Sequence, residues 1–443
     1  MASIPQTINR SFVEAAKSSE RSSNFFSSGT SVCSSFSTDT TVSSRRIDLL
    51  REERRLQQEK IRDCFKSLES ESRVFQRRAS KIVSATNEDI QTDRIMGVGS
   101  FSKVCSVRRM SMNFQNEVGS QCSSRCSSRQ REPQTEYDGL DDEISLYSKR
   151  DTELPIDTSF RSIGTEDSNA KHYVMKQLRD DLSKEMRMVG SLHLAKEARF
   201  LEGLRHPNIT SIYSKGEMPG SVNFFIVQEK LHICLEKCFR QWNNQNAVMN
   251  RNAPTVASLR KGGRRGRSQI KNVIFNERID VLIGVASALE FLHRNKIIFR
   301  DLKPGNVGIG YDSTPKIFDF GIAKELKERY RVEAGKDLFH LTSDCGTRRY
   351  MAPEVYWGEP YGLSADVFCF VTLVWEVMML IPPYKNMNKS EHENYVFVKN
   401  KRPAIKRSWK KQIKTLILKG WQKDTSKRPT MNDAVKVLQK IKS

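Results

Sequence analysis

The residues best suited to chemistry lie in two short stretches, each next to an apolar run. In FRDLKPGN, Asp301 can orient a substrate hydroxyl and accept its proton, Lys303 can neutralise a transferring phosphoryl group, and Asn306 can ligate a metal ion. In KIFDFG, Asp319 can hold Mg²⁺ between phosphate groups. Two carboxylates, an amide and a lysine in this order predict phosphoryl transfer.

A glycine-bearing turn far upstream has the composition of a phosphate-binding loop. The run IMGVGSFSKVCSV alternates apolar positions on either side of this turn, which consists of Gly97, Val98, Gly99, Ser100 and Phe101. Two close glycines let backbone N–H groups approach a phosphate with no Cβ in the way. Because ordinary hairpins also contain spaced glycines, the turn gains meaning only from the motifs that follow it.

A lysine and a glutamate come next in the chain. Lys176 lies in the strand-like run HYVMKQL, and Glu197 lies in the helical stretch KEARFLEGLRHPNI. A lysine grips phosphate oxygens well only where a carboxylate holds its flexible ammonium group in place. Glu197 shares a helical face with Leu194, Leu201 and Leu204. Taken alone, Glu197 would be interpreted as an ordinary residue on the helix surface. Together with Lys176, it is the candidate carboxylate that holds the lysine ammonium group.

Two further elements must position the catalytic stretch. FFIVQEKL is typical of a buried strand that ends at a polar corner, and IDVLIGVASALEFLHRNKII is typical of a long helix. That helix places Leu282, Val285, Leu289 and Leu292 on one face, so we expect it to pack against a core and to deliver FRDLKPGN at its end.

Taken together, GVGSFSKV, YVMK, Glu197, FRDLKPGN, DFG and YMAPE resemble the signature set of eukaryotic protein kinases. The resemblance covers about Asp89 to the C-terminus. Lys303 is similar to the serine/threonine-specific members, and PYGLSADVFCFVTLVWEV and ILKGWQKDTSKRPTM are similar to the tyrosine-kinase-like branch. The resemblance implies transfer of the γ-phosphoryl group from ATP, with Mg²⁺, to Ser/Thr hydroxyls of protein substrates in intracellular signalling. The alternative is a pseudokinase that acts as a scaffold or allosteric partner.

The implied fold is α+β and two-lobed. A small β-rich N-lobe would span about 89–228, a larger helical C-lobe would span about 229–443, and ATP would lie between them. Gln228 falls at the gatekeeper position of the hinge, where many kinases have Met, Thr or Leu. Besides the glycine turn, the implied nucleotide contacts are Val104, Val174, Lys176, Glu229 and Leu231.

The resemblance also assigns structural roles. It implies that Glu354 pairs with Arg428 and that Asp366 braces the catalytic loop from a buried helix. Phe299 replaces the histidine of the usual His-Arg-Asp triplet, and as a packing residue it can still contact Phe320. The expected apolar stack through both lobes comprises Leu201, Ile212, Phe299 and Phe320.

Three positions besides Phe299 depart from the family pattern. Ser102 replaces the third glycine of the loop, at modest expected cost. Gly305 replaces a residue that is usually acidic or polar. Gly308 stands where a bulky apolar residue usually forms the floor of the adenine pocket. Gly308 predicts a looser floor, weaker nucleotide binding, or compensation by a neighbour such as Ile309.

Regulation by phosphorylation is expected in the segment before YMAPE. An upstream kinase, or the protein itself by autophosphorylation, would attach a phosphate to this segment. Arg300 would supply the cation that binds this phosphate. Ser343 is the best candidate acceptor, eleven residues before Glu354, with Thr342 as its neighbour. Thr347 is expected to contact Asp301 and Lys303 instead.

The rest of the chain divides by composition. Residues 1–44 are Ser/Thr-rich and are predicted to be disordered, and residues 45–88 form a charged, partly helical segment without a strict heptad repeat. The kinase-like region, 89–443, carries two expected loop insertions, at about 109–170 and 243–271. The second includes the basic run LRKGGRRGRSQIK.

Composition restricts partners and compartment. The net charge of +22 predicts attraction to polyanions such as nucleotides, acidic peptides, anionic membranes or nucleic acid. No module of a nucleic-acid-binding type accompanies the basic run, so nucleic acid is not the expected partner. Nine scattered cysteines favour a reduced, intracellular setting, cytoplasmic or nuclear. No membrane span is expected, because no stretch of about eighteen apolar residues occurs.

Overall fold

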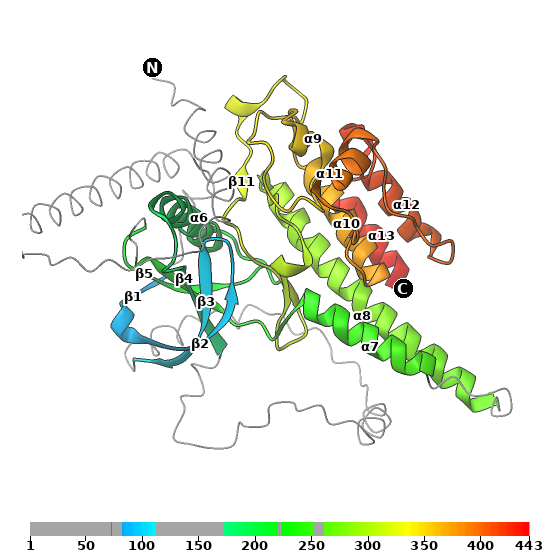
Figure 1. The fold of residues 1–443 in the computed structure, drawn as a ribbon, viewed down its shortest axis with the longest axis horizontal. Helices are drawn as coiled ribbons and strands as arrows, with labels where there is room; N and C mark the ends of the chain where they lie inside the picture. The colour runs from blue at the N-terminus through cyan, green and yellow to red at the C-terminus, as the bar shows by residue number, and fades with distance from the viewer. Residues whose placement is uncertain are drawn as a thin grey trace, which may run out of the picture.

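The computed structural model describes residues 72, 82–111, 172–219, 221, 223–251 and 261–442, and it describes only the backbone of 248–251 and 261–270. It has a β-sheet lobe and a larger helical lobe (Figure 1), which confirms the predicted α+β, two-lobed architecture. The predicted disordered tail, most of the charged segment and residues 112–170 of the first insertion lie outside the described residues.

The N-lobe is built on a six-stranded sheet of order β1-β5-β6-β4-β3-β2. Its strands are β1 Val83–Ala85, β2 Ile90–Val98, β3 Ser102–Met110, β4 Tyr173–Leu178, β5 Ile212–Gly216 and β6 Phe225–Glu229. All neighbouring pairs are antiparallel except β1 with β5. Side chains alternate between faces, so Val174 and Lys176 lie on the face opposite Met175 of the outer apolar cluster.

The sheet begins earlier in the chain than the expected boundary at Asp89. Strand β1 and the first two residues of the 3₁₀ helix η1, Asn87–Asp89, fall within the segment predicted to be charged and partly helical. Val83 and Ala85 are buried while Ser84 is exposed, and the Val83 carbonyl accepts a 2.7 Å hydrogen bond from the Ser214 hydroxyl. A three-residue strand is too short to show its alternation in the sequence.

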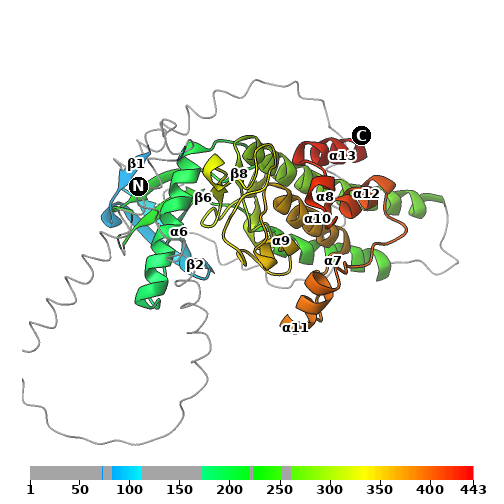
Figure 2. The same cartoon turned by 90° about the horizontal axis from the view of Figure 1, so that it is seen from above.

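Helix α6, Lys184–Gly203, packs against β4, β5 and β6 and carries Glu197 (Figure 2). Ser183 caps its start by accepting a hydrogen bond from the Met186 N–H at 3.3 Å. Leu194, Ala198 and Leu201 recur at helical spacing and are buried in the main core. This face brings Glu197 to the inner side of the sheet.

The C-lobe is helical, and its long helix α8 packs against both α10 and α13. Its α-helices are α7 Leu235–Arg251, α8 Lys261–Arg294, α9 Pro353–Trp357, α10 Ser364–Met379, α11 Lys389–His392, α12 Lys411–Gly420 and α13 Met431–Lys442. Its single-turn elements are η4 Pro304–Asn306, η5 Glu328–Tyr330, the π-helical η6 Glu393–Val398 and η7 Thr425–Lys427. Its short strands are β7 Ile233–Cys234, β8 Ile297–Ile298, β9 Val307–Ile309, β10 Pro315–Ile317 and β11 Lys324–Glu325. One continuous apolar cluster joins α6 and β6 to the helices of this lobe.

The expectation of an irregular insertion over 243–271 is wrong for most of its length. Helix α7 continues to Arg251 and helix α8 starts at Lys261. Each glycine in this basic run costs a helix about 1 kcal/mol. Extending a helix is nevertheless far easier than nucleating one, and α8 is already anchored in the core by its later turns. Within the part of the chain that the structure describes, no helix is both long and apolar enough to cross a membrane.

Candidate active site

Lys176 on β4 joins the two lobes through a pair of carboxylates. Its Nζ lies 2.6 Å from Glu197 Oε2, on α6, and 3.2 Å from Asp319 Oδ1, which follows β10 in the C-lobe. Lys176 and Glu197 are both buried, while the Asp319 side chain is 44% exposed. The Asp319 carboxylate therefore remains open on one side for a further ligand.

The charges of these three groups set their protonation. Burial favours a neutral Lys176, but the charges of Asp319 and Glu197 outweigh this and raise its pKa above the ordinary value. The Lys176 ammonium lowers the pKa of Asp319. Burial raises the pKa of Glu197, and Lys176 opposes that rise. Lys176 and Asp319 thus stay charged at neutral pH, as the binding of a phosphate and a cation requires.

Asp301 is held by donors on both of its carboxylate oxygens. Thr347 Oγ1 donates to Oδ1 at 2.7 Å, and Oδ2 accepts from Lys303 Nζ at 2.9 Å and from Asn306 Nδ2 at 3.0 Å. Lys303 also donates to Thr347 Oγ1 at 2.9 Å. The contacts expected of Thr347 are therefore present, and they fix the orientation of a carboxylate that can accept a hydroxyl proton.

Asn306 and Asp319 carry the kind of oxygen donors that a divalent cation such as Mg²⁺ takes. Asn306 uses its amide nitrogen on the Asp301 carbonyl at 2.8 Å and on the Asp301 carboxylate. Its amide oxygen is therefore turned away from Asp301 and is available as a ligand. Among the described residues no group of three or more His, Cys, Asp or Glu gathers to hold a metal. One carboxylate and one amide, completed by phosphate oxygens, match the way proteins bind Mg²⁺.

Asp366 braces the catalytic loop from the first turn of α10. This fully buried carboxylate accepts hydrogen bonds from the Phe299 and Arg300 N–H groups, both at 2.8 Å, and lies 3.0 Å from His293 Nε2. Arg300 has φ +71°, an unfavourable value for a residue with a side chain, and these bonds hold it there. Phe299 is buried and packs edge-to-face on Phe320 at 5.1 Å, so it occupies the packing role expected of it.

The activation segment runs from DFG to YMAPE. An ion pair connects its end to the C-terminal part of the lobe. Arg428 donates to both oxygens of Glu354, at 2.5 and 2.9 Å, and to the Ser364 carbonyl at 3.0 Å. Both members of this ion pair are buried. A bidentate pair with a further hydrogen bond to a backbone carbonyl is a geometry in which a buried ion pair is least costly.

The glycine turn lies between β2 and β3 and folds toward α6. The Gly99 N–H donates to the Ser102 carbonyl at 2.7 Å, and Arg179 donates from its backbone to the Phe101 carbonyl at 3.0 Å. The Phe101 ring contacts His193 of α6 edge-on at 5.3 Å. Apart from its chain neighbours, nothing lies within 4 Å of the place where a Cβ on Gly97 would stand, so this side of the strand is open. Ser102 itself is a regular strand residue opposite Leu178.

Leu231, in the hinge near Glu229 to Leu231 that connects the two lobes, fills the space beside Gly308. A Cβ on Gly308 would stand 2.4 Å from Leu231 Cδ1 and 3.2 Å from Leu231 Cβ. The compensating side chain is therefore Leu231, whereas the sequence suggested Ile309. Neighbouring Glu229 lies 2.8 Å from Lys316 Nζ in an ion pair, and Val104 and Val174 lie opposite Lys176 and Gln228 in the sheet.

Arg300 is already engaged by the activation segment. Its Nε donates to the Ile322 carbonyl at 2.7 Å, and its Nη1 donates to the Tyr361 hydroxyl at 3.3 Å. That hydroxyl donates in turn to the Thr342 carbonyl at 2.6 Å. Ser343, the next residue, is exposed. Ser343 is thus connected to Arg300 through one peptide unit and two hydrogen bonds.

Comparison with known protein families agrees with this geometry. A protein kinase domain model matches residues 162–438, more than half of the chain. The chain belongs to the protein kinase family. Its relatives include the Arabidopsis thaliana serine/threonine-protein kinases STY46, 33% identical over 161 residues, and VIK, 33% identical over 168 residues. The dual specificity protein kinase shkE of Dictyostelium discoideum is 28% identical over 249 residues.

These alignments cover only parts of the proteins compared. They take in 36%, 37% and 55% of this chain and 26%, 37% and 30% of STY46, VIK and shkE, respectively. The chain therefore spans well under half of the length of the relatives it matches. That STY46 and VIK are serine/threonine-protein kinases is compatible with the tyrosine-kinase-like features of the sequence.

Two features of this kinase domain were not expected from the sequence. Glu236 of α7 places Oε1 3.2 Å from the position of a Cβ on Gly305, so a carboxylate from another element stands beside the glycine that lacks one. Gln228 donates from Nε2 to Glu197 Oε1 at 3.0 Å. Long-range pairs of this kind carry no spacing signal, although the polar residue within the apolar FFIVQEKL run was a visible hint.

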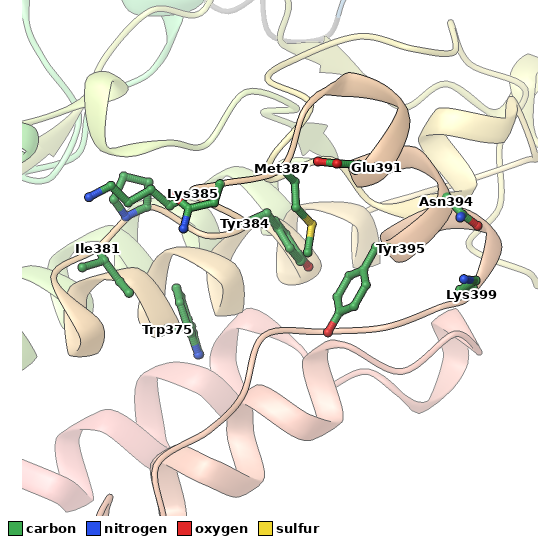
Figure 3. A pocket seen from close by; sticks show the side chains of 11 residues that line it. Trp375, Ile381, Tyr384, Lys385, Met387, Glu391, Asn394, Tyr395 and Lys399 are labelled. Atoms are coloured by element: carbon green, nitrogen blue, oxygen red, sulfur yellow. The ribbon is translucent and has the colours of Figure 1, made fainter.

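A cavity of about 670 Å³ lies elsewhere in the C-lobe, between the end of α10 and the segment around α11 (Figure 3). Trp375, Tyr384 and Tyr395 are among the side chains that line it. None of the catalytic-loop residues contributes to its wall, so it is separate from the kinase active site.

Proposed function

We propose that the chain is an active protein kinase that transfers the γ-phosphoryl group of ATP to Ser/Thr hydroxyls of proteins. The observation that supports this best is the pair of completed constellations, Lys176 with Glu197 and Asp319, and Asp301 with Lys303 and Asn306. A pseudokinase would have no need of both. Phosphorylation by an upstream kinase or by autophosphorylation, and an intracellular location, stay as predictions.

In the proposed reaction each residue acts on a defined atom. Asp301 orients the acceptor hydroxyl and takes its proton as the oxygen bonds to the γ-phosphorus and the bond from that phosphorus to the ADP oxygen breaks. Lys303 neutralises charge on the transferring group, and Lys176 grips the remaining phosphates. Asp319 and Asn306 would hold Mg²⁺, which supplies charge neutralisation on the phosphates when bound.

An assay with purified protein, labelled ATP and a generic basic protein substrate tests this proposal. Asp301→Asn keeps the shape of the side chain but removes the proton acceptor, so transfer should fall by about a hundredfold or more. Asp93→Asn, an exposed aspartate on β2, is the matched control and should retain wild-type activity. The proposal would be contradicted if the wild-type protein transferred no phosphate, or if Asp301→Asn transferred phosphate at the wild-type rate.

We also propose that phosphorylation of Ser343 activates the domain. The side chain is exposed, and its neighbour Thr342 is linked through Tyr361 to Arg300. Positive charge gathers around Arg300, since burial, with the nearby charges of Arg300 and Lys196, lowers the pKa of Lys324 to about 8. A phosphate that reaches Arg300 would bring negative charge to this region.

Phosphate mapping of active protein and kinetics of Ser343→Ala test the regulatory proposal. Ser343→Ala should lower activity relative to phosphorylated wild type, while Ser390→Ala, an exposed serine of α11, should not. Full activity in Ser343→Ala protein would refute a role for this residue and direct attention to Thr342.

A further inference from the structure

Gln228 occupies a central position beneath the nucleotide-binding side of the sheet. It lies near the end of β6, opposite Val174 on β4 and Ile212 on β5, so strands flank it on both sides. Its side chain is 6% exposed. Because side chains alternate along β6, Gln228 shares a face with Ile226, the residue opposite Lys176. Gln228 is therefore an immediate neighbour of the Lys176 ion pair.

The amide of Gln228 completes the hydrogen bonding of Glu197. Lys176 Nζ donates to Oε2 of this carboxylate at 2.6 Å, and Gln228 Nε2 donates to Oε1 at 3.0 Å. An ionised carboxylate accepts hydrogen bonds and donates none, so it is the amide nitrogen that faces it. Each oxygen of Glu197 thus has its own donor, one from β4 and one from β6.

This second donor matters because Glu197 is almost fully buried, with 1% of its surface exposed. A buried carboxylate oxygen without a donor carries a large desolvation cost. An apolar gatekeeper would leave Oε1 in that state, and the carboxylate would rotate, take up a proton or draw away from Lys176. Each outcome loosens the ammonium group that has to grip the phosphates.

We propose that Gln228 is a positioning residue for phosphoryl transfer: it holds the Glu197 carboxylate in the orientation that fixes Lys176. This rests on the proposed kinase activity. The gatekeeper thereby has a role in catalysis in this chain through a hydrogen bond, which an apolar residue at the same position cannot make.

Steady-state kinetics and thermal unfolding of the full chain separate this role from a packing role. Gln228→Met keeps nearly the same length and volume but removes the N–H donor, and kcat/KM for ATP should fall about tenfold. The melting temperature should fall only modestly, because the buried Glu197 oxygen loses its donor, so activities are compared well below the melting temperature of both proteins. Gln228→Glu should lose more activity than Gln228→Met, because it sets a second carboxylate against Glu197. Gln91→Met, an exposed glutamine on β2, is the matched control.

A double-mutant cycle with Glu197→Gln identifies the group through which Gln228 acts. If the role runs through the Glu197 carboxylate, Gln228→Met should cost about tenfold in the wild-type background and almost nothing in the Glu197→Gln background. Equal losses in both backgrounds, or wild-type kinetics in Gln228→Met, would overturn the proposal. Gln228→Leu repeats the comparison if the methionine variant does not fold. Measurable transfer by wild type keeps the proposed function standing even when the Gln228 proposal fails.

Discussion

At the scale of single residues, two glycines in the catalytic stretch show how a missing side chain is replaced from elsewhere in the fold. Leu231 of the hinge occupies the space beside Gly308, and Glu236 of α7 brings a carboxylate beside Gly305. The motif itself, with Asp301 at its head, was predictable because its residues are close in sequence and few other chemistries use them in that order. The compensations were not predictable, because each depends on a side chain more than sixty positions away.

Gly308→Leu should therefore weaken the nucleotide site. The new side chain would collide with Leu231, and overpacking of this kind costs about 1 to 3 kcal/mol. ATP affinity measured by calorimetry should fall, and Leu231→Ala combined with Gly308→Leu should recover much of it. Unchanged affinity and stability in Gly308→Leu would show that Leu231 does not form the floor.

Glu376 gives the domain a pH-dependent stability. Burial raises the pKa of Glu376 from 4.5 to about 7, although Tyr350 donates a 2.5 Å hydrogen bond to it. Between these values the folded state binds a proton that the unfolded state releases, so stability falls as pH rises from about 4.5 to about 7.

Glu376→Gln removes this titration and keeps an acceptor for Tyr350. The unfolding free energy of the variant relative to wild type should increase by about 3 kcal/mol between pH 4.5 and pH 8. Urea titrations at a series of pH values measure it, with exposed Glu359→Gln as the control. A constant difference across this range would contradict the assignment.

At the scale of elements, prediction succeeded where periodicity was long and failed where it was short or masked by composition. Helix α6 and the core turns of α8 follow from the apolar spacing that the sequence shows. Strand β1 was missed because three residues cannot display a period. The prediction is wrong at the end of α7 and the start of α8, because glycine and basic residues are typical of loops, while the anchored core turns of each helix extend outward.

The link between α9 and η7 should prove a main support of the C-lobe. Arg428→Ala leaves the Glu354 carboxylate buried without its partner, which costs about 3 to 5 kcal/mol. Lys427→Ala removes an adjacent, exposed cation and should change stability by less than about 1 kcal/mol. Equal midpoints of denaturant unfolding for the two variants would show that the pair adds nothing.

At the scale of the whole molecule, the two lobes are connected by polar contacts as well as by the hinge and the shared core. Lys176 reaches Asp319 across the lobes at 3.2 Å, and the Ser72 hydroxyl, ahead of the sheet, donates to Glu325 of β11 at 2.6 Å. For the first contact, the sequence motifs assigned Lys176 and Asp319 to the same site but predicted no direct interaction between them. Nothing in the sequence pointed to the second, because Ser72 lies in a segment that composition marks only as charged.

Binding of Mg²⁺ and ATP should therefore stabilise both lobes together. A ligand at a hundredfold excess over its Kd adds about 2.7 kcal/mol to the unfolding free energy, and the increase should appear as a single, later thermal transition. Because the open side of the Asp319 carboxylate is the proposed cation ligand, EDTA should remove most of the shift in wild type. Asp319→Asn should show only a small shift with or without EDTA. A full shift in wild type in the presence of EDTA would mean that the nucleotide binds without the cation and that Asp319 is not its ligand.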